Sequence, residues 1–312
     1  MTTQEDIYRQ HEAEIDRGYR WLVEHGRWLD CPMIVSIETY AKCNASCEFC
    51  PYPTIERQGA RLPPATVRAL IDEIAGFSVP PQRLNFSRVN EPFLDPNLLD
   101  YMRHAAERLS ATDLVIFSNG QTITDKVIDQ LNEIATFRTL NISFNEHDAG
   151  RYQEVMGIDQ AATLPRLRNL HRRFEEGTVR FNVTLLRVGT SSSADRAFAD
   201  WCKAEFPAFP VFSSARFDWV DRSTSKMAHT APDAGCSQWF SLHILADGQS
   251  AFCCIDGDGR VQPVRIGDRS LLAIYNQPEK RILRERATSR RQVPGCDGCI
   301  HGMPSAAYAV PE

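Results

Sequence analysis

Short apolar segments alternate with amphipathic segments over the first 210 residues of the chain. Five segments have the length and the β-branched content of buried strands: residues 33–39, 83–89, 113–119, 139–145 and 179–186. Between them, apolar residues recur every three or four positions, as on one face of a helix, over residues 64–77, 96–109, 124–135 and 162–177. Repeated strand–helix units predict an α/β fold with a parallel sheet and outer helices, either open or closed into a full or partial barrel.

The alternation stops near residue 210, where prolines and small residues interrupt it. Further on, "FSLHILADGQSAFCCIDGDGR" (residues 240–260) has the pattern of a β-hairpin: strand, Asp-Gly turn, strand. The basic segment "KRILRERATSRR" (280–291) is expected to form a solvent-exposed helix face. We therefore predict three regions: an N-terminal helical extension over 1–32, an α/β domain over 33–210 and a small C-terminal domain over 211–312.

Composition narrows the functional classes. The 312 residues are 43% hydrophobic and 24% charged, with a net charge of −5 and no basic tract. A nucleic-acid or membrane-surface partner is therefore not expected, and a small-molecule substrate is. The N-terminus is polar and no stretch approaches 18 apolar residues, so we expect a cytoplasmic protein. Its ten cysteines then favour metal binding over disulfides, with Cys31 and Cys202 as core thiols.

Three cysteines lie within eight residues, directly after the first predicted strand: Cys43, Cys47 and Cys50. In parallel sheets of this kind, ligands bind at the carboxyl ends of the strands. A structural zinc needs four ligands, commonly as two separated pairs, and this stretch supplies three. Iron–sulfur clusters are held by closely spaced thiolates, normally four. Three thiolates would leave one iron open to a substrate or a cofactor.

The C-x3-C-x2-C spacing after a first strand resembles the signature of radical S-adenosylmethionine (SAM) enzymes. This resemblance implies a partial (β/α)6 barrel and a [4Fe-4S] cluster held by Cys43, Cys47 and Cys50. In the family, the amino and carboxylate groups of SAM bind the open iron of that cluster. One electron then splits SAM into methionine and a 5′-deoxyadenosyl radical, which abstracts a hydrogen atom from the substrate. Phe49 matches the aromatic residue that precedes the third cysteine and lies beside the adenine.

Three later segments resemble SAM-binding segments of the same family, in the same order along the sheet. They are "RVNEPFLDPNLLDY" (88–101), "FSNGQTIT" (117–124) and "NISFNEHDAGRYQEVMG" (141–157). The resemblance implies SAM contacts from six residues: Asn90, Glu91, Ser118, Asn119, Ser143 and Asn145. Glu91 matches the residue that binds the SAM amino group, whereas asparagine stands at position 90 where the family has glycine.

The C-terminal region holds half of the cysteines, in the pattern Cys236-x11-Gly248-x4-Cys253 followed by Cys296-x2-Cys299. This pattern resembles the shortened, "twitch" form of the SPASM domain, whose four cysteines hold an auxiliary [4Fe-4S] cluster. Cys254 is the alternative to Cys253 as the second ligand, and the Gly-x4-Cys spacing favours Cys253. Zinc is the alternative to the cluster, because four cysteines with one C-x2-C pair are also typical of zinc ribbons.

Twitch members of the family include the dehydrogenase of 2-deoxy-scyllo-inosamine and a GTP cyclase. The resemblance therefore predicts an oxidoreductase that acts on a small polar metabolite, such as a sugar or an aminocyclitol, with a flavodoxin or a ferredoxin as reductant. An oxidation also needs a proton acceptor, and "SARFDWVDRS" (214–223) offers Arg216, Asp218 and Asp221. The alternatives are a radical SAM peptide maturase and a non-enzymatic iron–sulfur or zinc protein.

Overall fold

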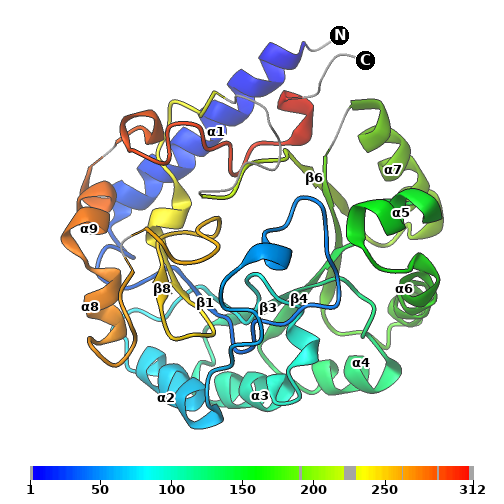
Figure 1. Ribbon diagram of the computed structural model, residues 1–312, viewed down its shortest axis with the longest axis horizontal. Coiled ribbons are helices and arrows are strands. Elements are labelled where there is room, and N and C mark those ends of the chain that lie inside the picture. Colours follow the sequence, from blue (N-terminus) through cyan, green and yellow to red (C-terminus); the bar gives the residue numbers. More distant parts are fainter. Residues whose placement is uncertain (1–2, 190–191, 221–229, 262, 287, 309–312) are drawn as a thin grey trace.

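The computed structural model of the protein describes residues 3–189, 192–220, 230–261, 263–286 and 288–308. Within these residues, eight strands form one sheet in the order β6-β5-β4-β3-β2-β1-β7-β8. All neighbouring strands are parallel except β7 and β8, which are antiparallel. Figure 1 shows the strands curving inside a ring of helices. The protein thus has the predicted α/β fold, a partial barrel with a small C-terminal hairpin region.

The strands are β1 (Ile34–Ile37), β2 (Arg83–Asn85), β3 (Asp113–Ser118), β4 (Phe137–Ser143), β5 (Asn182–Val188), β6 (Val211–Ser214), β7 (Ser241–Ile244) and β8 (Ser250–Ala251). The helices are α1 (Gln4–His25), α2 (Pro64–Ala75), α3 (Leu98–Arg108), α4 (Asp125–Asn132), α5 (Ala149–Met156), α6 (Gln160–Glu175), α7 (Ser192–Glu205), α8 (Leu271–Tyr275) and α9 (Pro278–Glu285). Each of the five predicted strands and four predicted helices is present, with ends shifted by a few residues.

The C-terminal hairpin continues the barrel sheet. β7 runs parallel to β1 and pairs with it from Ile34 to Ile37, and β8 returns after the Asp247-Gly248 turn. Gly248 has φ +84°, a conformation that favours glycine. The sixth parallel strand, β6, begins just after the boundary predicted at residue 210. The sheet of the first predicted region therefore extends into the second.

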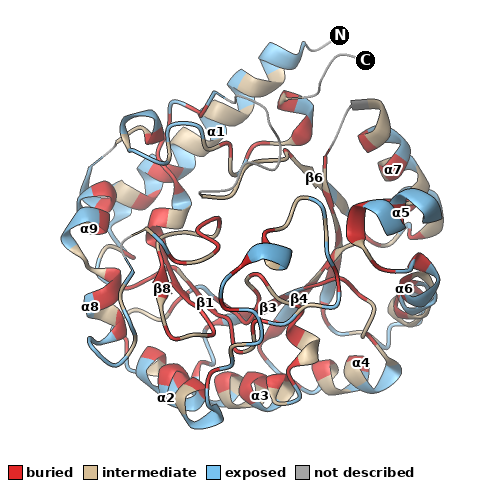
Figure 2. Cartoon of the chain, in the orientation of Figure 1, coloured by how far each residue is buried: buried red, intermediate tan, exposed pale blue. Residues whose placement is uncertain are grey.

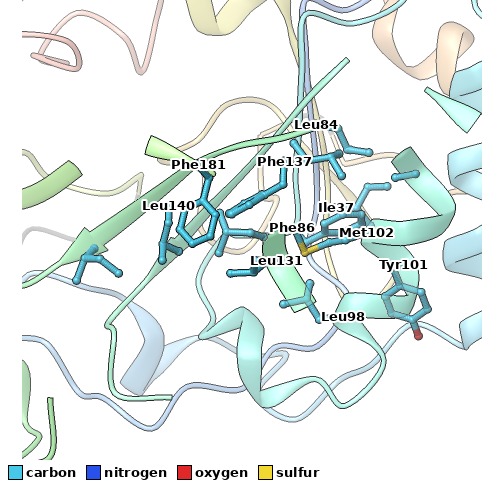
Figure 3. Packing of buried hydrophobic residues seen from close by; sticks show 14 of the residues in the cluster. Ile37, Leu84, Phe86, Leu98, Tyr101, Met102, Leu131, Phe137, Leu140 and Phe181 are labelled. Atoms are coloured by element: carbon cyan, nitrogen blue, oxygen red, sulfur yellow. The ribbon is translucent and has the colours of Figure 1, made fainter. Parts of the chain in front are cut away.

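The core lies between the sheet and the surrounding helices. In α3, Leu98, Tyr101 and Met102 follow the three- and four-residue spacing of one helix face, and all are at most 1% exposed. Figure 3 shows them packed near Ile37 and Phe86 from the strand side. Burial of a side chain of this size contributes roughly 1.5–3 kcal/mol. Figure 2 shows that the helices around the ring have buried residues on their inner faces and exposed residues on their outer faces.

Helix α1 packs against the C-terminal region, as Figure 1 shows. The Tyr19 hydroxyl donates hydrogen bonds to the backbone oxygens of Leu283 and, at 2.7 Å, Arg286. Its ring occupies the space that a side chain at Gly235 would need, because a Cβ there would lie 2.2 Å from the ring. The N-terminal helix thus covers the segment that carries Cys236. No helix in the described part of the chain is long and apolar enough to cross a membrane.

The expectation for residues 280–291 is wrong at three positions. Lys280, Arg284 and Arg290 are 6%, 0% and 2% exposed. Their charged groups lie among backbone oxygens, which replace the hydrogen bonds that water would give. Cys31 and Cys202 are buried core thiols, as predicted.

Candidate cofactor sites

The loop after β1 carries Cys43, Cys47 and Cys50 and lies over the centre of the ring, drawn in blue in Figure 1. The end of α5 fixes this loop. The Ser46 and Glu48 backbone N–H groups donate to the Met156 and Val155 oxygens, both at 3.0 Å. Gly157 follows α5 with φ +68°, and a Cβ there would lie 1.9 Å from Ser46 Oγ. The Met-Gly pair of the 141–157 segment therefore shapes the loop between the first two cysteines.

The three cysteines line one cavity of about 130 Å³. Burial raises the pKa of Cys43 to about 12 and of Cys50 to about 11, and raises the pKa of Cys47 well above its ordinary value. Such thiols become thiolates where a bound metal compensates their charge. The donor set and the cavity beside it therefore fit a cluster held by three cysteines with room for a small cofactor.

Glu91 lines the same cavity and is 2% exposed. Its carboxylate accepts hydrogen bonds from the Asn119 backbone N–H at 2.7 Å and from Ser118 Oγ at 2.9 Å. Burial nevertheless raises its pKa to about 7, against the effect of these hydrogen bonds. An ammonium or amine group in the cavity would restore the carboxylate charge.

Most of the other predicted SAM contacts also line this cavity: Phe49, Asn90, Ser118, Asn119 and Ser143. The structure explains why asparagine can stand at position 90. Asn145 alone among the described non-glycine residues has a positive φ, so position 90 does not need glycine for its conformation. Asn145 is not among the described residues that line the cavity. Its side chain accepts from the Val188 N–H and donates to Met156 Sδ.

A buried ion pair, which the sequence reasoning did not find, closes the base of the cysteine loop. Glu38 follows β1, is 0% exposed, and accepts from Arg57 Nε at 2.6 Å and Nη2 at 2.9 Å. The same carboxylate accepts from the Val89 and Ala246 backbone N–H groups, both at 3.1 Å. Glu38 therefore joins the cysteine loop, the segment after β2 and the C-terminal hairpin.

A second cavity, of about 300 Å³, lies in the C-terminal region. All five cysteines of this region line it: Cys236, Cys253, Cys254, Cys296 and Cys299. Burial raises the pKa of Cys296 and of Cys299 to about 12 and that of Cys253 well above its ordinary value. The donor set fits an auxiliary iron–sulfur cluster by the same reasoning as at the first cavity.

The fifth thiol has a neighbour of its own. Cys254 Sγ lies 3.8 Å from Nδ1 and 3.7 Å from Nε2 of His301, which lines the cavity as well. Both Cys253 and Cys254 face the cavity, so the choice of Cys253 as ligand stays a prediction. Among the described residues, no three His, Cys, Asp or Glu side chains are close enough to hold a single metal ion.

Arg88, also missed by the sequence reasoning, connects the two cavities. It lines the first cavity, and its Nη2 donates to the Cys253 and Asp256 oxygens beside the second, each at 3.2 Å. Its Nη1 lies 3.3 Å from His243 Nδ1, which accepts because arginine can only donate. A group bound near Arg88 would thus lie close to both sets of cysteines.

The segment after β6 crosses between the same two regions. Trp219 Nε1 donates to the Phe49 oxygen at 2.9 Å, and the Val220 N–H donates to the Ile255 oxygen at 3.1 Å. Arg216, a predicted catalytic residue, forms an ion pair with Glu48 at 2.9 Å. Asp218 is partly buried in this segment, and Asp221 lies outside the described residues.

Two protein families match the regions of the chain that contain the two sets of cysteines. The profile of the Radical SAM superfamily matches residues 37–192, which is half of the chain. The profile of SPASM, an iron-sulfur cluster-binding domain, matches residues 236–300. No curated protein sequence matches the chain.

Solved structures of low sequence identity share the fold. BtrN in complex with AdoMet and 2-DOIA is 14% identical with a TM-score of 0.56, over 89% of this chain and 98% of that chain. Streptococcus suis SuiB bound to S-adenosylmethionine is 14% identical with a TM-score of 0.63, over 86% of this chain and 72% of that chain. Streptococcus suis SuiB bound to the precursor peptide SuiA is 14% identical with a TM-score of 0.62, over 80% of this chain and 66% of that chain.

Proposed function

Because the chain belongs to the Radical SAM superfamily, we propose that it oxidises a hydroxyl-bearing carbon of a small polar metabolite, such as a sugar or an aminocyclitol. The observation that carries this proposal is the position of Arg88, which lines the first cavity and binds the Cys253 loop of the second. A substrate beside Arg88 would lie between the group that removes a hydrogen atom and the group that accepts an electron.

The protein is a radical SAM enzyme of the SPASM type, with SAM and iron–sulfur clusters as cofactors. We propose that Cys43, Cys47 and Cys50 hold the [4Fe-4S] cluster that binds SAM. Four thiols of the C-terminal cavity, with Cys253 as the second, would hold the auxiliary [4Fe-4S] cluster. When bound, the first cluster with SAM supplies a radical that abstracts hydrogen, and the second supplies an electron acceptor.

The residues around the first cavity then have distinct tasks. The Glu91 carboxylate would accept from the SAM amino group, and Asn119 would orient the adjacent part of SAM. Trp219 and Val220 bind backbone oxygens of the two cysteine loops, so the segment that carries them would help to exclude water from a substrate held between these loops. Since Arg216 is paired with Glu48, we assign it to fixing the cysteine loop and keep Asp218 as the candidate proton acceptor.

Oxidation of an alcohol to a ketone removes one hydrogen atom, one proton and one electron. The proton would go to Asp218 or through it to solvent, and the electron to the auxiliary site. We propose a flavodoxin or a ferredoxin as the reductant for the cluster that Cys43, Cys47 and Cys50 would hold. Because the cysteine ligands must stay reduced, we propose that the reaction takes place in the cytoplasm.

Among the similar structures, BtrN guides the choice of substrate class, because the likeness spans 98% of that chain. Its structure contains AdoMet and 2-DOIA. The likeness to SuiB bound to the precursor peptide SuiA makes a peptide substrate the second candidate. Small metabolites and peptides would give different products, so one experiment with both kinds of substrate can distinguish the two candidate functions.

The test uses anaerobically reconstituted protein with SAM, a reductant and two sets of candidates: sugars and aminocyclitols deuterated at one carbinol carbon, and peptides. We expect 5′-deoxyadenosine one mass unit heavier, with a carbonyl product two hydrogens lighter than the substrate. The matched control carries deuterium at a neighbouring carbon and should give unlabelled 5′-deoxyadenosine. Turnover of peptides alone would replace the proposed function by a peptide maturase.

A further inference from the structure

Three cations contact the cysteine segments of the C-terminal region: Arg88, Lys280 and Arg290. Lys280 is 6% exposed and Arg290 is 2% exposed, whereas Arg88 is partly exposed. They come from three separate parts of the chain, the segment after β2, helix α9 and the segment after α9. We call these residues the cation triad.

Each member of the cation triad binds backbone beside a cysteine. Lys280 Nζ donates to the Ser241 oxygen at 2.6 Å and to the oxygen of Phe252, the residue before Cys253, at 2.8 Å. Arg88 Nη2 donates to the oxygen of Cys253 itself. The positive charges therefore lie along the loop that carries the second predicted ligand.

Arg290 holds the other cysteine segments. Its Nη1 donates to the Cys299 and His301 oxygens at 3.3 and 2.9 Å, and its Nη2 donates to the Gly235 oxygen at 2.8 Å. It also lines the cavity. The triad thus contacts the segments of Cys236, Cys253 and Cys299.

No member of the triad forms an ion pair within 4.0 Å among the described residues. The Glu38 charge acts on Arg88 from further away and is itself paired with Arg57. Within the described part of the chain, Nε of Arg88 and Nε of Arg290 are buried and have no hydrogen-bond acceptor. An unpaired buried charge is strongly unfavourable, so sites of this kind are normally completed by an anion. The thiols that line the cavity can supply negative charge there, as can the carboxylate of Glu279, which lines it as well.

We propose that the cation triad balances the charge of the auxiliary iron–sulfur cluster and raises its reduction potential. A thiolate-ligated cluster is anionic and gains one further negative charge when it takes up an electron. Buried cations stabilise the reduced form more than the oxidised form, because the interaction grows with the charge. This role of the triad rests on the proposed function of the auxiliary cluster as electron acceptor, since the triad would favour uptake of the electron there.

The test measures the auxiliary cluster in the full-length, reconstituted protein without substrate. An EPR-monitored redox titration is run with and without SAM, and the signal that SAM does not change is assigned to the auxiliary cluster. Lys280→Met removes one charge, and Lys280→Arg keeps it. The matched control is Arg281→Met on the same helix, since Arg281 is paired with Asp30 and Glu285 at the surface.

We expect Lys280→Met to weaken the one-electron reduction of the auxiliary cluster about tenfold, which equals a fall of about 59 mV. Lys280→Arg and Arg281→Met should stay near the wild-type potential. Loss of the cluster in Lys280→Met but not in Lys280→Arg would also support the proposal, because only the first substitution removes the positive charge at position 280. An unchanged potential in Lys280→Met, or loss of the cluster in both Lys280 variants, would overturn it.

Metal analysis of the wild-type protein separates this inference from the proposed function. Zinc in the C-terminal cavity would remove the electron acceptor and the triad proposal together. Failure to oxidise any tested metabolite would leave the redox titration unaffected, because that titration uses no substrate.

Discussion

The position of Glu91 allows a quantitative prediction for Glu91→Gln. Burial raises the pKa of Glu91 from 4.5 to about 7, so the fold without SAM favours the protonated carboxyl. Its contribution to stability is fully present below about pH 4.5 and is lost as the pH rises to about 7. Each pKa unit corresponds to about 1.4 kcal/mol, so the loss between pH 5 and pH 8 is on the order of 2–3 kcal/mol.

Glutamine is neutral at both pH values and has nearly the same shape. Relative to the wild type, Glu91→Gln should therefore gain on the order of 2–3 kcal/mol in the free energy of unfolding between pH 5 and pH 8. Urea denaturation of the metal-free protein at the two pH values measures this difference, and titration of all other groups cancels. Glu154→Gln, a substitution at an exposed residue of α5, is the control and should show no such shift.

The affinity for SAM should increase with pH, whereas the stability of the wild-type protein without SAM should decrease. The wild-type affinity should rise as the pH approaches about 7, whereas the affinity of Glu91→Gln should be about 10- to 100-fold lower at pH 7.5 and lack this rise. The reason is that a hydrogen bond to a charged acceptor contributes about 1.5–3 kcal/mol. Isothermal titration calorimetry with cluster-loaded protein measures the SAM affinity of the wild type and of Glu91→Gln at each pH. Equal affinities of the two proteins at pH 7.5 would refute the placement of the SAM amino group at Glu91.

Three further variants test the cofactor sites. Cys47→Ala should abolish formation of 5′-deoxyadenosine, measured by chromatography, and leave a folded protein with about four irons; undiminished cleavage would refute the site. Cys296→Ala combined with Cys299→Ala should lower the iron content from about eight to about four per chain and keep SAM cleavage, yet give no oxidised product; an oxidised product would disprove the electron-acceptor role. Gly157→Ala should displace Ser46 and lower iron loading of the first site, because the added Cβ would lie 1.9 Å from Ser46 Oγ; normal iron content would show that the loop adapts.

The cysteine loop and the barrel could be predicted because their signals are local in sequence. Cys43, Cys47 and Cys50 lie within one loop, and strand and helix periods are read over about ten residues. The hairpin was predictable for the same reason, since Asp247-Gly248 is a turn signal between two apolar runs.

The connections between the sites could not be predicted in this way. Glu38 and Arg57 pair across 19 positions, and Arg88 meets the Cys253 oxygen across 165. The burial of Lys280 depends on backbone oxygens of β7 and of the residue after β8, so its segment resembles an ordinary surface helix in sequence. A basic helix that carries one Leu and one Ile gives no local sign of which cations point inward.

The metal content of the wild-type protein tests the central claim most directly, because that claim requires two clusters in two cavities. The chain, reconstituted without oxygen and freed of unbound metal, should contain about eight irons and no zinc, with Mössbauer spectra of two [4Fe-4S] clusters. About four irons and one zinc per chain would contradict it, since the C-terminal cavity would then be a structural site that cannot accept an electron.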